Sequence, residues 1–363
     1  MYSSLRHIPS VVAKKRPVQL TFFVTRKCNA GCPYCFYLKS ARRAAGGNGT
    51  KAEELSLEEV RRISSSLGRL LWITFSGGEP FLREDLTEIS AAFYDRNKPS
   101  FMLYPTNGTL PELIQETTER ILQHCTRSVV SVKLSVDGLN GDHDALRRSP
   151  GGFEKAVETH RLLAGLLDRY PNFELGINTV FLSENQETMD EIIDFVDALD
   201  PRGTHTISLV RGDLAAGRYK NVDLEKYAHA IGRLEAKLQD GTTATHRFTG
   251  GRLKAAQDIV QRRLIHQTLR AGKRQIPCYA GRLSLVLTET GDVYPCEILS
   301  TRLGNIRDHD HDIGTLLRSG PARDVLGDVS GDQCFCTHEC NFITNILFNP
   351  RSYPALFREY LRL

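Results

Sequence analysis

The 363-residue sequence lacks any apolar run long enough to cross a bilayer. Its longest runs, such as LLWITF at 70–75, fall well short of the ~20 residues that a transmembrane helix needs. The N-terminus, MYSSLRHIPSVVAKKRPVQL, also lacks the apolar core and small-residue cleavage site of a signal peptide. We therefore predict a cytoplasmic protein without a membrane span.

The chain has no strong charge of either sign. Its formal net charge is +4, and its basic residues do not gather into one long tract. This balance neither suggests nor excludes nucleic acid, and we do not expect a nucleic-acid partner. With 40% hydrophobic and 25% charged residues, the composition suits a globular protein with a packed core. The length exceeds one ordinary domain of ~100–200 residues, although a single α/β barrel could fill much of it.

Nine cysteines are present, but disulfides are not expected because the cytosol keeps thiols reduced. Eight of them fall into two groups, at 28–35 and at 278–340. Cys125 stands alone at the end of an expected helix, where we predict a small buried residue. Cysteines that cluster in a reduced protein indicate metal chemistry.

Short β-rich runs alternate with helical segments between residues 18 and 213. The capping-box pair Ser56 and Glu59 marks the start of one such helix. Six strands that alternate with helices predict parallel β/α units, either as a partial (βα)6 TIM-like barrel or as an open doubly wound sheet. The expected strands cover 19–25, 71–77, 101–108, 129–138, 173–181 and 205–212.

The most distinctive short motifs stand where these strands end. They read TRKC, SGGEP, PTNG, SVDG and VRGD. In β/α barrels the active site forms at the C-terminal ends of the strands. Their positions therefore indicate an enzyme of the α/β class.

We divide the chain into five parts. These are an N-terminal extension (1–17), the barrel (18–213), a helical connector (214–275), a small cysteine-rich β-hairpin/α module (276–345) and a C-terminal helix (346–363). The module contains LSLVLTETGDVYPC, which predicts two strands around a Thr-Gly-Asp turn.

The first cysteine group, TRKCNAGCPYCFY, places Cys28, Cys32 and Cys35 within eight residues. Three thiolates suit a [4Fe–4S] cluster with one iron left open. The alternative is a zinc site that a distant Cys or His completes. At this point the sequence resembles the radical SAM superfamily, whose Cys-x3-Cys-x-aromatic-Cys motif includes Tyr34 here.

That resemblance implies a [4Fe–4S] cluster whose open iron is chelated by S-adenosylmethionine. It also implies reductive cleavage to a 5′-deoxyadenosyl radical, which takes a hydrogen atom from the substrate. SGGEP resembles the family's GGEP motif, so Gly77 and Gly78 would let the backbone approach the methionine amino group. Glu79 would shape that turn. An ordinary strand-to-helix turn is the alternative.

The motifs after the third and fourth strands resemble cosubstrate-contacting positions. Asn107 and Ser135 are implied to hydrogen-bond the ribose or the carboxylate, with loop capping as the alternative. Arg147 resembles the arginine that meets the methionine carboxylate, and Arg148 beside it is the other candidate. Val210, on the sixth strand, is a weaker match. The sequence identifies no catalytic acid or base.

The second cysteine group resembles the auxiliary-cluster domains named SPASM and Twitch. It contains Cys278-x12-Gly291-x4-Cys296, followed by CFCTHEC with Cys334, Cys336 and Cys340. A full SPASM domain uses seven cysteines for two clusters, so these five imply one auxiliary [4Fe–4S] cluster of Twitch type. Cys278, Cys296 and Cys340 are the firmer ligands, and Cys334 and Cys336 compete for the fourth place. A structural zinc site is the alternative.

The resemblance favours a radical SAM oxidoreductase. Its auxiliary cluster would support net oxidation, crosslinking or epimerisation of a small molecule or peptide. An electron donor such as flavodoxin or ferredoxin is implied as a partner. One alternative is an enzyme similar to sulfatase maturases or to peptide-modifying enzymes, which acts on a protein or peptide side chain. A remote alternative is a zinc-stabilised binding protein.

Overall fold

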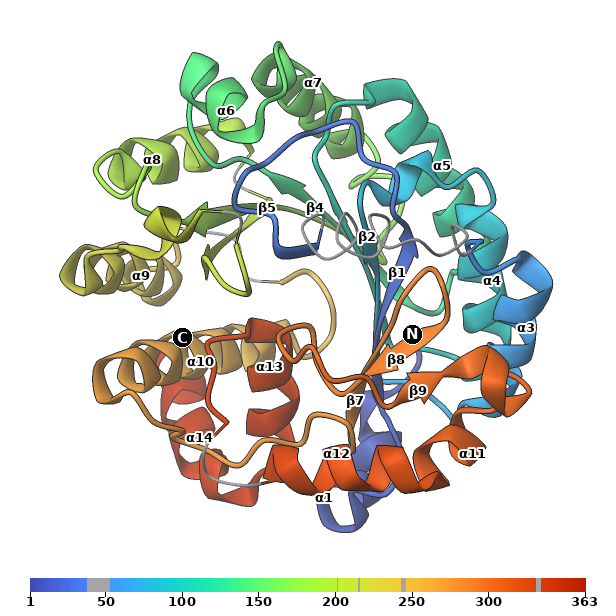
Figure 1. Ribbon diagram of the computed structural model, residues 1–363. Coiled ribbons are helices and arrows are strands. Elements are labelled where there is room, and N and C mark those ends of the chain that lie inside the picture. Colours follow the sequence, from blue (N-terminus) through green and yellow to red (C-terminus); the bar gives the residue numbers. More distant parts are fainter. Residues whose placement is uncertain (38–52, 201, 215, 243–245, 331–333) are drawn as a thin grey trace.

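The computed structural model describes residues 1–37, 53–200, 202–214, 216–242, 246–330 and 334–363. One nine-stranded sheet forms its centre, in the order β6-β5-β4-β3-β2-β1-β7-β8-β9 (Figure 1). The strands are β1 (Gln19–Thr25), β2 (Trp72–Gly77), β3 (Phe101–Thr106), β4 (Val129–Ser135), β5 (Phe173–Phe181), β6 (Thr204–Leu209), β7 (Ser284–Leu287), β8 (Asp292–Tyr294) and β9 (Gly304–Asn305).

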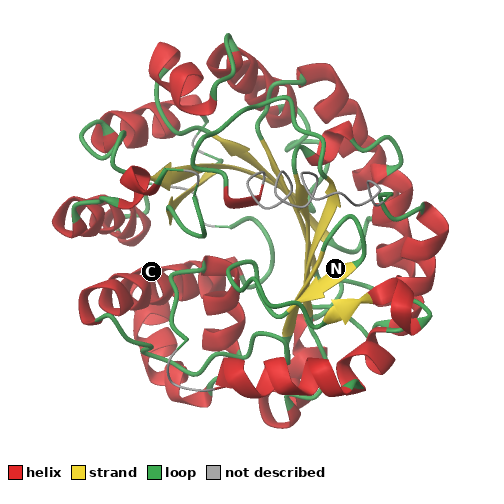
Figure 2. Cartoon of the chain, in the orientation of Figure 1, coloured by secondary structure: helices red, strands yellow, loops and turns green. Residues whose placement is uncertain are grey.

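The first six strands form a partial barrel. Each of β1 to β5 pairs in parallel with the next strand along the chain. A doubly wound sheet would reverse its strand order at a switch point, and none occurs among these six strands. Figure 2 shows the helices on the outside of the curved sheet. Of the two arrangements predicted, the barrel is therefore confirmed.

Helices cover the outer face of the sheet and continue around its open side (Figure 1). The predicted capping box begins α3, where the Ser56 hydroxyl accepts from Glu59 N and the Glu59 carboxylate accepts from Ser56 N. The helices are α1 (Ile8–Ala13), α3 (Leu57–Ser66), α4 (Leu86–Asn97), α5 (Pro111–His124), α6 (Asn140–Arg147), α7 (Gly152–Ala164), α8 (Met189–Leu199), α9 (Leu224–Gln239), α10 (Gly251–Ala271), α11 (Ile313–Arg318), α12 (Gly320–Ser330), α13 (Glu339–Leu347) and α14 (Tyr353–Arg362).

Alternation along the strands separates a packed core from an inner face. On β3, Met102 and Tyr104 are fully buried in the core, while Leu103 and Pro105 are partly exposed. The same alternation follows β4, where Ser131, Lys133 and Ser135 are the partly exposed positions. Because successive side chains of a strand point to opposite faces, the partly exposed set lines the inside of the barrel. We call this space the lumen.

The hairpin predicted in the second module is present, but it does not stand apart from the barrel. β7 and β8 are antiparallel, with Val286 opposite Tyr294. β7 also pairs in parallel with β1, with Ser284 opposite Gln19. The hairpin therefore extends the barrel sheet beyond β1, so that sheet pairing crosses the boundary predicted near residue 276.

The predicted helical connector contains α9 and α10, and α10 packs against both α13 and α14. Cys125 is completely buried in the main core, as expected for an apolar filler. Among the described residues, no helix is both long and apolar enough to span a membrane.

Candidate functional site: two cysteine groups at the mouth of the barrel

The first cysteine loop follows β1 directly. Burial is the main factor that raises the pKa of the Cys28 thiol to about 11, and Cys32 and Cys35 lie near enough to raise it further. The three predicted ligands therefore share one small region. The backbone N–H of Cys35 donates to the carbonyl of Cys32 at 3.2 Å, which curls the loop between them.

The two glycines of SGGEP support this loop through backbone contacts. Gly78 N donates to the Thr25 carbonyl, and Glu79 N donates to the Lys27 carbonyl, both at 2.8 Å. A Cβ atom on Gly77 would collide with the Thr25 carbonyl, and one on Gly78 would collide with that of Lys27. Gly77 also has a φ of +130°, a conformation that favours glycine. The predicted contact of these glycines with a methionine amino group stays a prediction.

Glu79 joins the ends of β2 and β3. Its carboxylate accepts from Asn107 N and the Thr106 hydroxyl, both at 2.8 Å, and from Phe81 N at 3.3 Å. The side chain is almost fully buried. Burial raises its pKa to about 7, although these hydrogen bonds and Arg147 act in the opposite direction. Glu79 therefore joins the turns after β2 and β3 through its hydrogen bonds, and its part in the cosubstrate site stays a prediction.

Asn107 connects the third-strand turn to the cysteine loop. Its Nδ2 donates to Asn29 Oδ1 at 2.7 Å, and its Oδ1 accepts from Thr109 N and the Thr109 hydroxyl. Asn29 lies immediately after Cys28 in the sequence. The loop-capping role considered for Asn107 is thus present, and a contact with the cosubstrate stays a prediction.

A buried group of polar side chains supports the loop from behind. Asp137 Oδ2 accepts from Arg147 Nε at 2.8 Å and from the Tyr34 hydroxyl at 2.6 Å, and its Oδ1 accepts from Val180 N. Burial alone would raise the pKa of Asp137, but Arg147 and these donors outweigh it and lower the pKa. Asp137 is therefore a carboxylate that holds both Arg147 and Tyr34.

Arg147 also contacts the cysteine loop through its backbone. Its carbonyl accepts from Gly31 N at 3.0 Å and from the Cys32 thiol at 3.8 Å. A Cβ atom on Gly31 would lie 3.3 Å from Arg148 Cβ, so Arg148 packs beside the same loop. The structure places both arginines at the loop, but only Arg147 pairs with Asp137. Their predicted contact with a carboxylate of the cosubstrate stays a prediction.

The remaining predicted cofactor residues lie nearby. Tyr34 and Val210 belong to one small apolar cluster, in which the Tyr34 ring meets that of Tyr219 edge to face. Ser135 ends β4 on the lumen side, and its hydroxyl has no hydrogen-bond partner in the described part of the chain. Asn178, opposite Ser135 in register, accepts from the Ser208 hydroxyl at 2.8 Å. Ser135 is thus the predicted contact that is most open to a ligand.

The second cysteine group is assembled from three segments of the chain. Burial raises the pKa of Cys296 to about 12, and both Cys336 and Cys278 add to that effect. Burial likewise raises the pKa of Cys336 to about 11, with further contributions from Cys278 and Cys334. These effects place Cys278, Cys296, Cys334 and Cys336 close together. Arg274 holds the last segment, since its Nε donates to the Cys334 carbonyl at 2.8 Å.

Cys340, one of the firmer ligands predicted, has different neighbours. Burial raises its pKa to about 12, and the strongest charges acting on it are those of Glu297, Arg211 and Glu339. Its sulfur, a Glu297 carboxylate oxygen and a His338 ring nitrogen lie within 4.8 Å of one another.

The hydrogen bonds of His338 disfavour a metal ion between these three side chains. His338 is the N-cap of α13, and its Nδ1 accepts from Asn341 N at 3.3 Å. Its Nε2 therefore carries the proton and faces Glu297 Oε2 at 2.6 Å. A protonated nitrogen has no free lone pair for a metal. The His338 side chain is buried, with Nδ1 in the helix cap and Nε2 in contact with Glu297.

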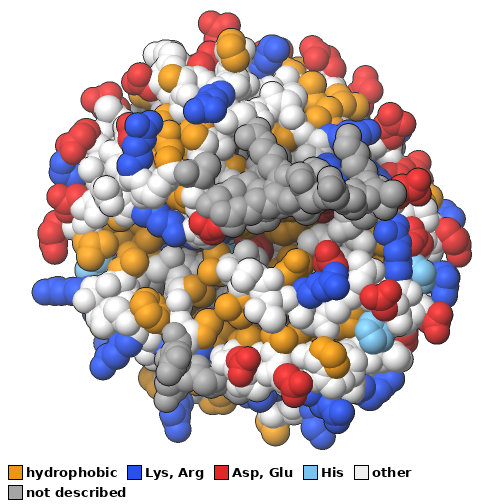
Figure 3. All heavy atoms as spheres, in the orientation of Figure 1, with side chains coloured by type: hydrophobic (Ala, Val, Ile, Leu, Met, Phe, Trp, Pro, Cys, Tyr) orange, Lys and Arg blue, Asp and Glu red, His pale blue; other side chains and the backbone are white. Residues whose placement is uncertain are grey.

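Arg211, just after β6, connects the two cysteine groups. Its guanidinium lies 5.6 Å from the ring centre of Phe36, the residue after Cys35. The same guanidinium lies 3.5 Å from Glu297 and 2.9 Å from Glu339, which adjoin Cys296 and Cys340. The two groups therefore share one wall of the barrel mouth. Figure 3 shows this face of the molecule, with hydrophobic side chains in its central hollow.

Little in the sequence indicates these connecting residues. VRGD was noted only as a strand end, and an arginine after a strand has many possible partners. Asn29 and Glu297 each adjoin a cysteine, but adjacency in sequence does not show which way a side chain points. Their roles depend on contacts between distant segments.

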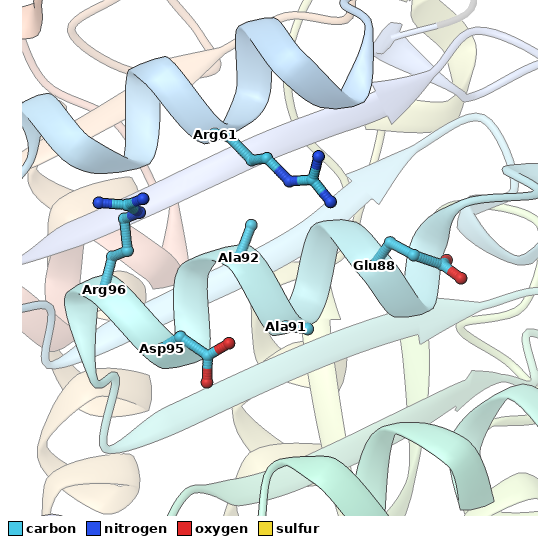
Figure 4. A pocket seen from close by; sticks show the side chains of 6 residues that line it. All are labelled: Arg61, Glu88, Ala91, Ala92, Asp95 and Arg96. Carbon is cyan, nitrogen blue, oxygen red and sulfur yellow. The ribbon is translucent and has the colours of Figure 1, made fainter.

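A shallow depression lies elsewhere, on the outer helices α3 and α4 (Figure 4). Its walls are formed by Arg61, Glu88, Ala91, Ala92, Asp95 and Arg96. It contains no cysteine and lies across the sheet from the lumen, so it is separate from the candidate site.

The residues present fit iron–sulfur chemistry. In both groups, burial raises the pKa of cysteine thiols to about 11 or 12. A buried thiolate is unfavourable without a positive partner, and metal ions supply one when they bind thiolates. Soft sulfur donors in sets of three and four suit iron–sulfur clusters, as well as zinc.

Comparisons with known proteins agree with this geometry. Residues 22–196 match the model of the radical SAM superfamily. The chain is 28% identical over 305 residues to an AdoMet-dependent heme synthase from Methanosarcina barkeri (strain Fusaro / DSM 804), covering 80% of each chain. It is 26% identical over 291 residues to a PqqA peptide cyclase from Rhodopseudomonas palustris (strain ATCC BAA-98 / CGA009), covering 79% of this chain and 69% of the relative.

The fold is similar to the solved structure of native anSMEcpe with bound AdoMet. The TM-score is 0.56 at 18% identity, and the match covers 95% of this chain and 97% of the other. The matched residues, 22–196, include the three cysteines of the first loop and most of the barrel. Residues 22–196 therefore belong to the radical SAM superfamily, whose members take a [4Fe–4S] cluster and S-adenosylmethionine as cofactors, and the chain as a whole is similar to members of its SPASM/Twitch subfamily.

Proposed function

We propose that the protein is a radical SAM oxidoreductase that carries out a net oxidation of a small molecule, with one auxiliary [4Fe–4S] cluster. Cys28, Cys32 and Cys35 would hold the first cluster. The nearness of these three thiols, on a loop fixed by Asn107, Glu79 and Arg147, supports this assignment.

The auxiliary cluster would be held by Cys278, Cys296, Cys334 and Cys336. Cys278 acts on both Cys296 and Cys336, and Cys336 lies near Cys296 and Cys334, whereas the strongest charges acting on Cys340 are those of Glu297, Arg211 and Glu339. This set differs from the sequence prediction, which preferred Cys340 over one of Cys334 and Cys336. A [4Fe–4S] cluster with four cysteine ligands needs no further protein donor.

The observation that carries the proposal is the position of Arg211 between the two cysteine groups. One guanidinium contacts Phe36 beside the first group and Glu297 beside the second. A substrate at the mouth of the lumen would then lie near both groups. When bound, the first cluster and S-adenosylmethionine supply a 5′-deoxyadenosyl radical, and a second cluster supplies a one-electron acceptor.

The protein's own residues would position the reactants. Ser135 offers a free hydroxyl toward the lumen, and the packed cluster around Tyr34 and Val210 excludes water beside the loop. A net oxidation removes a hydrogen atom and one electron from the substrate, and any proton that the product then releases passes to water. A second cluster that accepts this electron favours oxidation over an epimerisation, which returns a hydrogen atom and leaves no electron to accept.

The match to a heme synthase over 80% of both chains supports a small-molecule substrate. Peptide modification is the second candidate, because the chain also resembles a PqqA peptide cyclase. An electron donor such as flavodoxin or ferredoxin and a location in the cytoplasm stay predictions of the same proposal.

The test is S-adenosylmethionine cleavage by anaerobically reconstituted protein, with dithionite as reductant. The wild type should form 5′-deoxyadenosine. The variant with Cys278, Cys296 and Cys336 all changed to Ala should still form it, because the first loop is intact. Wild-type protein that forms no 5′-deoxyadenosine would contradict the radical function.

The substrate class is tested in the same assay by adding an iron porphyrin or a peptide. Acceleration by the porphyrin, dependent on the second cysteine group, is the expected result. Acceleration by peptides alone would replace the small-molecule proposal with peptide modification.

A further inference from the structure

Three residues form a row across the inner face of the barrel. Register pairs Lys133 of β4 with Gly176 of β5, and Gly176 with Thr204 of β6. A Cβ atom on Gly176 would lie 2.5 Å from both Lys133 Nζ and Thr204 Oγ1. Because glycine has no side chain there, the ammonium reaches across β5 to the hydroxyls of Thr204 and Thr206.

Lys133 has no carboxylate partner within ion-pair distance among the residues that the structure describes. Its hydrogen bonds go to two neutral hydroxyls instead. Burial, with a further contribution from Lys254, lowers its pKa to about 8. Charged side chains that are buried away from water are normally paired, because the desolvation of an isolated ammonium costs free energy. The ammonium of Lys133 therefore lacks a counter-charge.

The two carboxylates that act most strongly on Lys133, those of Glu174 and Asp258, are already engaged. Glu174 accepts from Arg247 N, and its other oxygen lies 3.4 Å from His246 Nδ1. Asp258 of α10 binds the ammonium of Lys254 and lies 3.1 Å from His246 Nε2. Both carboxylates therefore pair with groups other than Lys133.

The charges that act on this row do not balance. Lys254 and Arg262 lower the pKa of Lys133, while Glu174 and Asp258 raise it. Among the five charged groups named here, Lys133 included, three are positive and two are negative. Arg262 has a buried Nη1 without a partner, and it lines a small cavity beside β6 that Thr204 and Thr206 also line. One further negative charge would neutralise this surplus.

We propose that Lys133, with Thr204 and Thr206, binds a carboxylate group of the substrate inside the lumen. A carboxylate brings one negative charge, which matches the surplus. A phosphate monoester brings nearly two and would face repulsion from Glu174 and Asp258. This inference rests on the proposed function, since it places the substrate in the lumen.

The row also has a suitable position for this role. Lys133 precedes Ser135 by two residues on the same face of β4, a separation of about 7 Å along the strand. β4 ends toward the cysteine loop, where Asp137 holds Arg147. A carboxylate held at Lys133 would therefore direct the remainder of the substrate toward the first cysteine group.

The test measures how fast cyanate carbamylates individual lysines in reconstituted holoprotein, read by peptide mass spectrometry. Acetate is the probe, acetamide is its uncharged analogue, and inorganic phosphate is the competing anion, all at constant ionic strength. Acetate should slow the carbamylation of Lys133 at least fivefold, and acetamide should not. Lys226, an exposed lysine paired with Glu187, is the matched control and should respond to neither.

Three results would overturn the proposal. Lys133 could remain unmodified without any probe, which would show that the ammonium is closed to the lumen. Acetate and acetamide could protect it equally. Phosphate could protect it more strongly than acetate, which would exclude a site built for a single negative charge.

This experiment distinguishes a failure of the proposed carboxylate site from a failure of the proposed radical function. Carbamylation requires no radical chemistry, so protection of Lys133 without 5′-deoxyadenosine formation would contradict only the proposed function. Normal 5′-deoxyadenosine formation without protection would contradict only the carboxylate site. Lys133→Met tests the assignment further, because labelling at this position must disappear while that of Lys226 persists.

Discussion

The two cysteine groups differ in how the chain builds them. Cys28, Cys32 and Cys35 lie on one loop after β1, which receives backbone hydrogen bonds from the β2 turn and gives one to Arg147. The second group draws on three segments: one before β7, one after β8 and one before α13. A local set of ligands depends on one loop, whereas a distributed set depends on how distant segments pack.

This difference predicts which substitutions each cysteine group tolerates. The first loop is supported by buried polar groups, chiefly Asp137 and Glu79. The second group is held by the hairpin on β1, by Arg274 and by the α13 N-terminus. Changes to single polar residues should therefore disturb the first site most, and changes to packing should disturb the second.

The largest expected effect comes from removing the local set. Changing Cys28, Cys32 and Cys35 together to Ala should abolish 5′-deoxyadenosine formation, because no thiolates remain on the loop to hold a cluster. About four irons per chain should remain at the second group. Iron analysis and chromatography of the nucleoside check this, and continued cleavage would show that the first loop is not the initiating site.

A paired comparison tests the distributed set. Cys336→Ala should lower the iron that is bound at the second group, because Cys336 lies among the other thiols. Cys340→Ala is the matched control and should leave the iron content unchanged, since its strongest neighbours are Glu297 and Arg211. The reverse pattern would restore Cys340 as a ligand, as the sequence predicted.

The first loop should also depend on the buried ion pair behind it. Asp137→Asn leaves Arg147 without its partner, and breaking a buried pair costs about 3–5 kcal/mol of unfolding free energy. Denaturant unfolding of the metal-free protein measures this loss. Glu158→Gln removes an exposed partner of Arg161 and serves as the control. Equal effects from both variants would contradict a supporting role for Asp137.

The smallest expected effect is a pH dependence at Glu79. Burial raises its folded-state pKa from 4.5 to about 7, so the folded chain holds a proton that the unfolded chain releases between these values. Stability should therefore fall by up to about 3 kcal/mol as pH rises through this window, then level off. Denaturant unfolding of the metal-free wild type, compared with Glu79→Gln, isolates this effect. A difference between the two that does not change with pH would contradict it.

Much of the barrel could be predicted because its signals are local. The predicted strands at 19–25 and 173–181 agree with β1 and β5 in full, and the Ser56–Glu59 capping box is present. Alternating apolar residues and turn motifs are set within a few positions of the chain. The spacing of the first three cysteines is equally local, and the thiols lie together as that spacing indicated.

The second part of the chain was less predictable for a physical reason. The parallel pairing of β7 with β1 joins residues more than 250 positions apart, and no local motif in the sequence indicates this pairing. The same holds for Arg211, which meets carboxylates beside Cys296 and Cys340 only after folding. Lys133 appeared as one polar residue in a strand, and its importance depends on Gly176 of the neighbouring strand.

The central claim is that both cysteine groups hold a cluster at one barrel mouth. Its most direct test is iron and acid-labile sulfide per chain in anaerobically reconstituted wild-type protein. We expect about eight irons and eight sulfides, from two [4Fe–4S] clusters. About four of each, with zinc bound at the second cysteine group, would contradict the account, because the oxidation would then have no second cluster as electron acceptor.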